Sequence, residues 1–380
     1  MPRTVGHFSP PLSPIASAPN FRRIPVPGTS FDTRFYRTVG ILELDIFCHS
    51  RIIFGMGHLH RIAVCSDIHY AGHRERQRGR YYLAGIQNPL GRWMLRAHRH
   101  FIWMRDAVAH NHLLDEFLNR SGAPDYVVAN GDYSCDTGFV GVSDDAACES
   151  AQECLQKIRQ KFATNFMTTI GDHELGKLSL GGGQGGMRVT SWHRAVNELG
   201  LQPLGRIELG RYVLIGIASS LVGYPVYEPE TLREERDAWQ RLREIHLQDI
   251  RRTFAALDSN QRVILVCHDP SALSFLWREE MVRSKLDQVE QTIIGHLHSN
   301  LVFRRSRWLA GMPTIRFLGH TPRRLSSALN QARFWKPFRV RLCPSLAGLE
   351  IERGGGFYTI ELDAAGDRPA RFELHRLTRK

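Results

Sequence analysis

Short apolar runs that end in metal-binding or proton-carrying side chains constrain this chain of 380 residues more than any other feature. The most distinctive run is Phe166 to Ile170, which is followed directly by Gly171-Asp172-His173-Glu174. Glycine lets a chain turn sharply, and ionisable groups at the end of a buried strand suit a functional site better than a core. Taken alone, this tetrapeptide indicates an ordinary solvated turn. Its recurrence elsewhere in the chain changes that interpretation.

Four other runs end in the same way. Ile62–Cys65 is followed by Asp67 and His69, Tyr126–Ala129 by Gly131-Asp132, Arg262–Cys267 by His268, and Thr292–Ile294 by His296 and His298. Between the runs, apolar residues at helical spacing predict a helix over about 101–119, and Asp144 and Asp145 can cap another that runs to about Phe162. This alternation predicts an α/β fold with functional residues on the loops that follow the strands.

The side chains at these strand ends are of the types that bind metals. Loops at one edge of a sheet converge in space, so the carboxylates and imidazoles can meet. Their supply exceeds what one cation takes, which favours two metal ions. Imidazole with carboxylate suits Zn, Fe or Mn, and the lack of thiolates in the motifs argues against a structural zinc site.

Each motif also has an ordinary structural interpretation. A lone His268 is more often a hydrogen-bonded interior histidine than a ligand, Gly131-Asp132 is commonly a turn, and the segment from His296 to His298 could be a surface loop. Ordinary turns and interior histidines do not explain why all five motifs occur in order, each at the end of a strand. His58 and His60 repeat the His-x-His pattern but precede a strand, so we interpret them as surface residues.

Together the motifs resemble the calcineurin-like metallophosphoesterases. The pattern of that family is Asp-x-His, Gly-Asp, Gly-Asn-His-Asp/Glu, His and Gly-His-x-His, and it is matched across about residues 60 to 300. The resemblance implies a four-layer αββα sandwich with two central mixed β-sheets and a metal site at the strand ends. It implies these roles: Asp67, His69 and His298 hold a first metal, His268 and His296 hold a second, Asp132 bridges both, and His173 lies beside the substrate phosphate.

Asp172 departs from the family pattern, which has Asn at this position. An Asn binds the second metal through a neutral carbonyl oxygen, whereas Asp offers an oxygen of the same reach with a negative charge. We expect Asp172 to bind the metal and to lower its Lewis acidity. The alternative is that Asp172 turns away or that the second site is weak.

The resemblance implies a metal-dependent hydrolase of phosphomonoesters or phosphodiesters with two divalent metal ions, Mn, Fe or Zn. In that mechanism a metal-bridging hydroxide attacks phosphorus, and His173 assists the leaving group while Glu174 orients His173. The branch of the family that cleaves UDP-diacylglucosamine tends to have Arg where His173 stands, which argues against that assignment. Two alternatives remain: a nuclease, and a catalytically silent metal-stabilised binding protein.

The formal net charge of +12 is concentrated in two stretches. Residues 71–105 contain eight Arg and one acid, and residues 301–349 contain nine Arg, one Lys and no acid. These side chains are either solvated surface Arg or a surface for a phosphorylated small-molecule or lipid substrate, an anionic membrane or nucleic acid.

Seven cysteines without a CxxC pair do not form a disulfide framework and favour the cytoplasm, with peripheral membrane association as an option. No apolar run is long enough to predict a transmembrane segment.

The expected domain organisation has two parts. Residues 1–55 are rich in Pro, Ser and Arg and read as disordered or as an extension from a mis-assigned start codon, with Met56 as the alternative start. Residues 56–380 form a single domain with a basic insertion near 71–100 and a β-rich part at 301–380. Strands are expected there at 314–318, 338–342, 348–351, 357–362 and 371–374.

Overall fold

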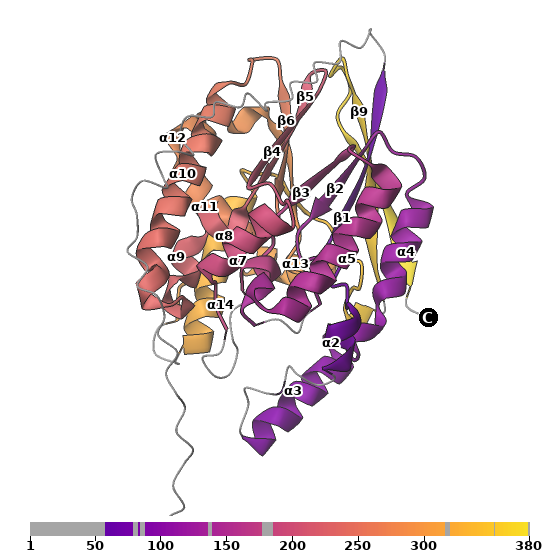
Figure 1. Ribbon diagram of the computed structural model, residues 1–380. Coiled ribbons are helices and arrows are strands. Elements are labelled where there is room, and N and C mark those ends of the chain that lie inside the picture. The colour runs from indigo at the N-terminus through magenta and orange to yellow at the C-terminus, as the bar shows by residue number, and fades with distance from the viewer. Residues whose placement is uncertain are drawn as a thin grey trace, which may run out of the picture. The chain divides into compact units, whose positions relative to one another are not determined.

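The computed structural model of the protein describes residues 58–78, 83, 88–135, 139–176, 185–315, 320–352 and 354–378. Within them the chain forms two mixed five-stranded β-sheets with helices on their outer faces (Figure 1). The predicted four-layer αββα sandwich is therefore confirmed. The expectation for residues 1–55 lies outside the described residues.

The first sheet has the strand order β10-β9-β1-β2-β3. Its strands are β1 (Leu59–Ser66), β2 (Tyr126–Asn130), β3 (Phe166–Thr169), β9 (Gly354–Asp363) and β10 (Arg371–Thr378). β1, β2 and β3 are parallel, whereas β9 is antiparallel to both β1 and β10. The C-terminal end of the described chain thus completes the sheet that its first strand begins.

The second sheet has the order β4-β5-β6-β7-β8. Its strands are β4 (Leu204–Leu209), β5 (Tyr212–Ile217), β6 (Arg262–Cys267), β7 (Val289–Ile294) and β8 (Val340–Leu342). β4 is antiparallel to β5 and the other pairs are parallel. The strand expected at 348–351 is wrong, because the chain there forms only an isolated bridge between Leu349 and Gly354 and then the 3₁₀ turn η11 (Glu350–Glu352).

Thirteen α-helical segments occur in the described parts of the chain. They are α2 (His73–Gln77), α3 (Pro89–Phe101), α4 (Asn111–Arg120), α5 (Asp145–Phe162), α6 (Asp172–Leu175), α7 (Val189–His193), α8 (Ser219–Val222), α9 (Tyr224–Tyr227), α10 (Arg236–Ala255), α11 (Leu273–Leu276), α12 (Glu280–Ser284), α13 (Asn300–Trp308) and α14 (His320–Gln331). None of the helices among these residues is both long and apolar enough to cross a bilayer.

Alternation along the strands builds three apolar layers. In β6, Ile264 and Val266 point between the two sheets, whereas Val263 and Leu265 point to the outer helices. α4 and α5 cover the outer face of the first sheet, and α10, α11 and α12 cover the second (Figure 1). Because both faces of each sheet are buried, the central strands read as continuous apolar runs in the sequence.

The helix predicted near 144–162 is α5, and its start has a clear physical cause. The Asp144 carboxylate accepts hydrogen bonds from the N–H groups of Ala146 and Ala147, as an N-cap residue does. The helix expected over about 101–119 is shorter, since α4 begins only at Asn111. The sequence did not reveal α3 or the edge strand β4.

The packing brings the carboxyl ends of both sheets together. Gly295 N donates to His268 O between β6 and β7, and Asp67 N donates to Gly131 O between β1 and β2. Gly131 has a φ of +76°, and a Cβ at this position would lie 2.8 Å from Gly171 Cα. Only glycine allows the loop after β2 to approach the loop after β3 this closely.

The buried His246 on α10 predicts that the folded state loses stability in acid. Its ring is buried, neither ring nitrogen has a hydrogen-bond partner within the described residues, and burial lowers its pKa to about 4. The unfolded chain, with an ordinary His pKa of about 6.5, binds this proton more readily, so the free energy of unfolding decreases as pH falls from about 6.5 to about 4. This one group accounts for about 3 kcal/mol of that loss.

We therefore expect His246→Leu to flatten the pH dependence of the unfolding free energy over this interval. Denaturant titrations at several pH values measure it. The matched control is His193→Leu on the exposed side of α7, which should leave the slope of the wild-type curve unchanged. Parallel curves for wild type and His246→Leu would contradict the assignment.

Candidate metal centre

The residues predicted at the strand ends share an unusual backbone conformation. Seven non-glycine residues in the described parts of the chain have a positive φ. Five of them are predicted metal ligands, namely Asp67, His69, Asp132, His296 and His298. A left-handed conformation is unfavourable for these side chains and persists only where the surrounding structure enforces it. The fold therefore holds this set of loops in place at a cost in backbone energy.

Four of the side chains form a first group, consisting of Asp67, His69, Asp132 and His298, whose ligand-type atoms all lie within 4.8 Å of one another. His69 Nε2 lies 3.2 Å from His298 Nε2, and His298 Nε2 lies 3.2 Å from Asp67 Oδ1. All four side chains are buried. They come from the loops after β1, β2 and β7, so both sheets contribute to the group.

A second group, whose ligand-type atoms also lie within 4.8 Å of one another, consists of Asp172, His268 and His296. Asp172 Oδ1 lies 2.8 Å from His296 Nδ1 and 3.2 Å from His268 Nε2. Asp172 therefore points toward the two histidines that the sequence pairs with it and does not turn away. Asp172 is the first residue of α6 and directly follows Gly171.

Asp132 connects the two groups. This residue belongs to the first group, and its Oδ2 atom lies 3.2 Å from His268 Nε2 in the second. This oxygen is buried and accepts no hydrogen bond of good geometry within the described residues. A buried carboxylate oxygen in this situation is stabilised when a cation binds it.

The spacing of the donor atoms fits bound metal ions. Two ligand atoms at about 2.0–2.2 Å from one metal lie roughly 3 to 3.5 Å apart. Distances of 3.2 Å therefore match neighbouring positions in a coordination shell, for His69 to His298 and for His268 to both Asp132 and Asp172. The set of imidazoles and carboxylates suits Zn, Fe or Mn.

Hydrogen bonds outside the two groups orient the imidazoles. His268 Nδ1 donates to the Asn130 carbonyl at 2.6 Å, and His69 Nδ1 lies 3.3 Å from the Ser134 carbonyl. With Nδ1 carrying the proton, Nε2 of each ring presents a lone pair to the centre. The Ser66 hydroxyl also donates to Asp67 Oδ2 at 2.5 Å. Sequence reasoning missed Ser66, Asn130 and Ser134, since nothing in their spacing distinguishes them.

In the absence of a cation, protons balance the charges of the second group. Burial opposes ionisation, yet His296 keeps the pKa of the Asp172 carboxyl well below its usual range. Burial likewise opposes protonation of His296, but Asp172 raises the pKa of that imidazole to about 10. A metal ion must displace such protons, so binding at this group becomes weaker as pH falls.

His69 in the first group behaves differently. Burial, followed by the nearby His173 and His298, lowers the pKa of the His69 imidazole to about 3. The ring is therefore neutral at physiological pH, which is the state that binds a metal.

His173 lies beside both groups. Its ring centroid is 4.7 Å from that of His69, its Nε2 is 3.9 Å from Asp132 Oδ2, and its backbone N–H donates to Asp132 Oδ1. The histidine is thus positioned at the edge of the centre.

Glu174 holds together the loops that follow β2 and β3. Its carboxylate accepts backbone N–H bonds from Gly171, Asp132 and Tyr133. Burial and the neighbouring Asp132 raise its pKa to about 7, although the three backbone donors oppose this shift. These contacts give Glu174 a role in positioning the backbone, and its orientation of the His173 ring stays a prediction.

A third cluster, His58, His60 and Asp125, also has ligand-type atoms within 4.8 Å of one another. It lies at the opposite end of β1 from Asp67 and is no part of the centre. His60 is buried, so its interpretation as a surface residue is wrong. Its position in β1 places it on the same face as the inward-pointing Ile62.

Comparisons with known proteins agree with the motifs. The family model described as calcineurin-like phosphoesterase matches residues 60–300. No curated protein sequence matches the chain. Among solved structures, a phosphopantetheinyl hydrolase from Mycobacterium tuberculosis is 14% identical, with a TM-score of 0.30 over 62% of this chain and 82% of that one. The match across 60–300 contains every strand end described above, and the chain belongs to the calcineurin-like phosphoesterase family.

Proposed function

We propose that the protein hydrolyses a phosphomonoester or phosphodiester at a centre that holds two divalent cations. The observation that carries this proposal is the pair of adjacent ligand groups joined through Asp132. Family membership supports metal-dependent hydrolysis of phosphoesters in general. Beyond this general activity, we propose that the number of cations is two and that single residues have the roles given below.

In this proposal, the first cation is held by Asp67, His69 and His298, and the second by Asp172, His268 and His296. Asp132 contributes to both. Bound cations of this kind lower the pKa of a coordinated water and offset negative charge on phosphoryl oxygens. The contribution of the protein is to fix the donor atoms in advance, which the left-handed backbone at five of these residues accomplishes.

His173 is the residue we assign to the leaving group. It lies at the edge of the centre, close to Asp132 and His69. From there it donates a proton to the leaving oxygen or a hydrogen bond to the phosphate. Glu174 acts indirectly, because it holds the loops that carry Asp132 and His173.

The test of the proposal uses two chromogenic substrates. The chain is stripped of metal with a chelator, Mn²⁺ is added back, and hydrolysis of p-nitrophenyl phosphate and bis-p-nitrophenyl phosphate is measured. We expect activity only after Mn²⁺ is restored, and the preferred compound distinguishes monoester from diester hydrolysis. No turnover of either compound by the reloaded protein would instead favour a metal-stabilised binding protein.

Asp172→Asn tests whether Asp172 binds the second cation. The variant restores the residue typical of the family and removes one negative charge from the second group. We expect metal affinity at one of two sites to decrease by about tenfold, measured by calorimetric titration of the metal-free protein with Mn²⁺. Asp287→Asn on the exposed turn before β7 is the matched control. Unchanged stoichiometry and affinity would count against Asp172 as a ligand.

His173→Ala tests the leaving-group role. The variant should keep its metal content, because His173 belongs to neither ligand group. We expect an activity loss of about 10² to 10⁴ for an alkyl phosphate ester, whose leaving group needs a proton, and a much smaller loss for a p-nitrophenyl ester. His193→Ala serves as the surface control. Equal losses on both esters would exclude a role in protonating the leaving group.

A further inference from the structure

Helix α3 turns its apolar side chains toward solvent. Leu90, Trp93, Met94 and Phe101 are 62%, 65%, 58% and 68% exposed. Their spacing places them on one stripe of the helix, and in a soluble protein such a stripe normally faces the core. The residue of α3 that is buried is instead Arg99. Unlike an ordinary surface helix, α3 thus leaves its apolar stripe exposed, and an exposed apolar surface of this kind is typical of an interaction site.

The flanks of this stripe are basic. Arg96, His98 and His100 are exposed on either side of it, Arg92 is exposed on the opposite side of the helix, and α3 contains no acidic residue. An exposed apolar stripe with a tryptophan, bordered by arginines and lacking acids, is the pattern of helices that lie in the interface of a lipid bilayer. The aromatic ring enters the headgroup region while the arginines attract anionic lipids.

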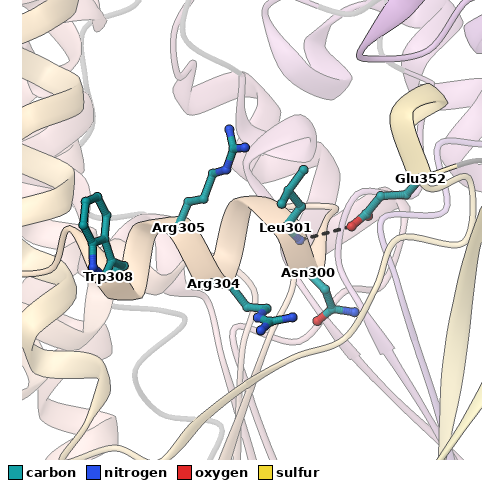
Figure 2. A pocket seen from close by; sticks show the side chains of 6 residues that line it. All are labelled: Asn300, Leu301, Arg304, Arg305, Trp308 and Glu352. Carbon is teal, nitrogen blue, oxygen red and sulfur yellow. Dashed lines mark hydrogen bonds between the residues drawn. The ribbon is translucent and has the colours of Figure 1, made fainter.

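Helix α13 repeats this composition independently. Phe303 anchors the helix by stacking on Trp335 in the core, while Leu301 and Trp308 remain 37% and 83% exposed. These two residues line an open pocket of about 440 Å³ together with Asn300, Arg304, Arg305 and Glu352. Figure 2 shows the Arg305 and Arg304 side chains extending from the helix on either side, with Trp308 at its end.

The two helices adjoin the same turn and the metal centre. The Trp103 carbonyl, just after α3, accepts a hydrogen bond from Glu350 N in η11, and Glu352 of η11 accepts one from Leu301 N at the start of α13. The Trp103 ring lies 4.7 Å from the ring of His298. α13 itself begins two residues after His298. The C-terminal end of α3 and the start of α13 therefore lie next to the first ligand group.

We propose that α3 and α13 together form a docking face for an anionic lipid bilayer. This docking face is defined by Leu90, Trp93, Met94, Phe101, Leu301 and Trp308 with the arginines that border them. It brings the metal centre to the membrane surface without a spanning segment. The binding does not depend on the proposed hydrolysis and is measured without turnover.

Charge and chemistry favour a bilayer over two other partners. A second copy of the chain would place Arg96 and Arg305 against arginines of the same kind, with few acids on the face to compensate. Nucleic acid would satisfy the arginines but has no acyl layer to receive Leu90 and Met94. An anionic bilayer satisfies both the charges and the apolar stripe.

The experiment is sedimentation of the full chain with vesicles. Vesicles of phosphatidylcholine alone are compared with vesicles in which about one third of the lipid is phosphatidylglycerol. We expect binding to the anionic vesicles, weakened as salt rises from about 0.15 M to about 0.5 M. The double variant Trp93→Ser with Met94→Ser and the variant Arg96→Glu should each lower the partition coefficient by about tenfold or more.

Matched controls come from α10, where Ile245 is 58% exposed and Arg241 is also exposed. Ile245→Ser and Arg241→Glu change the same properties away from the docking face and should bind like wild type. Circular dichroism verifies that each variant is folded.

Three results would overturn the proposal: no preference for anionic vesicles, equal losses in the control variants, or α3 variants that abolish only self-association or only DNA binding. Loss of catalysis with intact vesicle binding would count against the proposed function and leave the docking face standing.

Discussion

The centre depends on one buried carboxylate that binds backbone from two different loops. Glu174 accepts N–H groups of Asp132 and Tyr133 after β2 and of Gly171 after β3. Gly171 itself has no room for a Cβ, because the Asp132 carboxylate occupies that space. Three backbone hydrogen bonds to one buried carboxyl group, made in an environment without competing water, can hold Asp132 in a left-handed conformation. The position of Asp132 between the two ligand groups follows from this contact.

The two sheets contribute to the centre in a way that a single sheet could not. His268 follows β6 in the second sheet, yet its Nδ1 donates to the Asn130 carbonyl at the end of β2 in the first. His296 N in turn donates to Asp67 Oδ1 at 2.9 Å. These hydrogen bonds across the sandwich fix the ligand groups relative to each other and satisfy polar atoms that the inter-sheet core would otherwise leave unpaired. The apolar layer between the sheets and the polar centre at its edge therefore stabilise each other.

The sequence predicts this fold well where both faces of a strand are buried. β1, β6 and β7 read as apolar runs because the sandwich covers them on both sides, and their ends carry the candidate ligands. Contacts that depend on tertiary placement were not predictable. The role of Glu174 comes from loops that meet only in the fold, and Ser66 and Asn130 act through one hydroxyl and one carbonyl that no motif marks. In the false strand at 348–351, Leu349 is buried and forms only an isolated bridge with Gly354, and an apolar residue buried in this way cannot be distinguished by periodicity from one in a sheet.

The failure to predict α3 has a physical meaning of its own. Its apolar residues do recur at helical spacing, but they are mixed with arginines in a segment whose net composition is basic, and the stripe has no core to cover. The excess of arginine in 71–105 and in 301–349 was open to two interpretations from sequence, solvated surface or binding surface. The structure favours the binding surface, because α3 and α13 carry arginines from these stretches beside the exposed Trp93 and Trp308. Both helices also adjoin the turn next to His298. Solvated arginines need no apolar stripe beside them, so the joint placement of charge and apolar surface favours recognition over solubility alone.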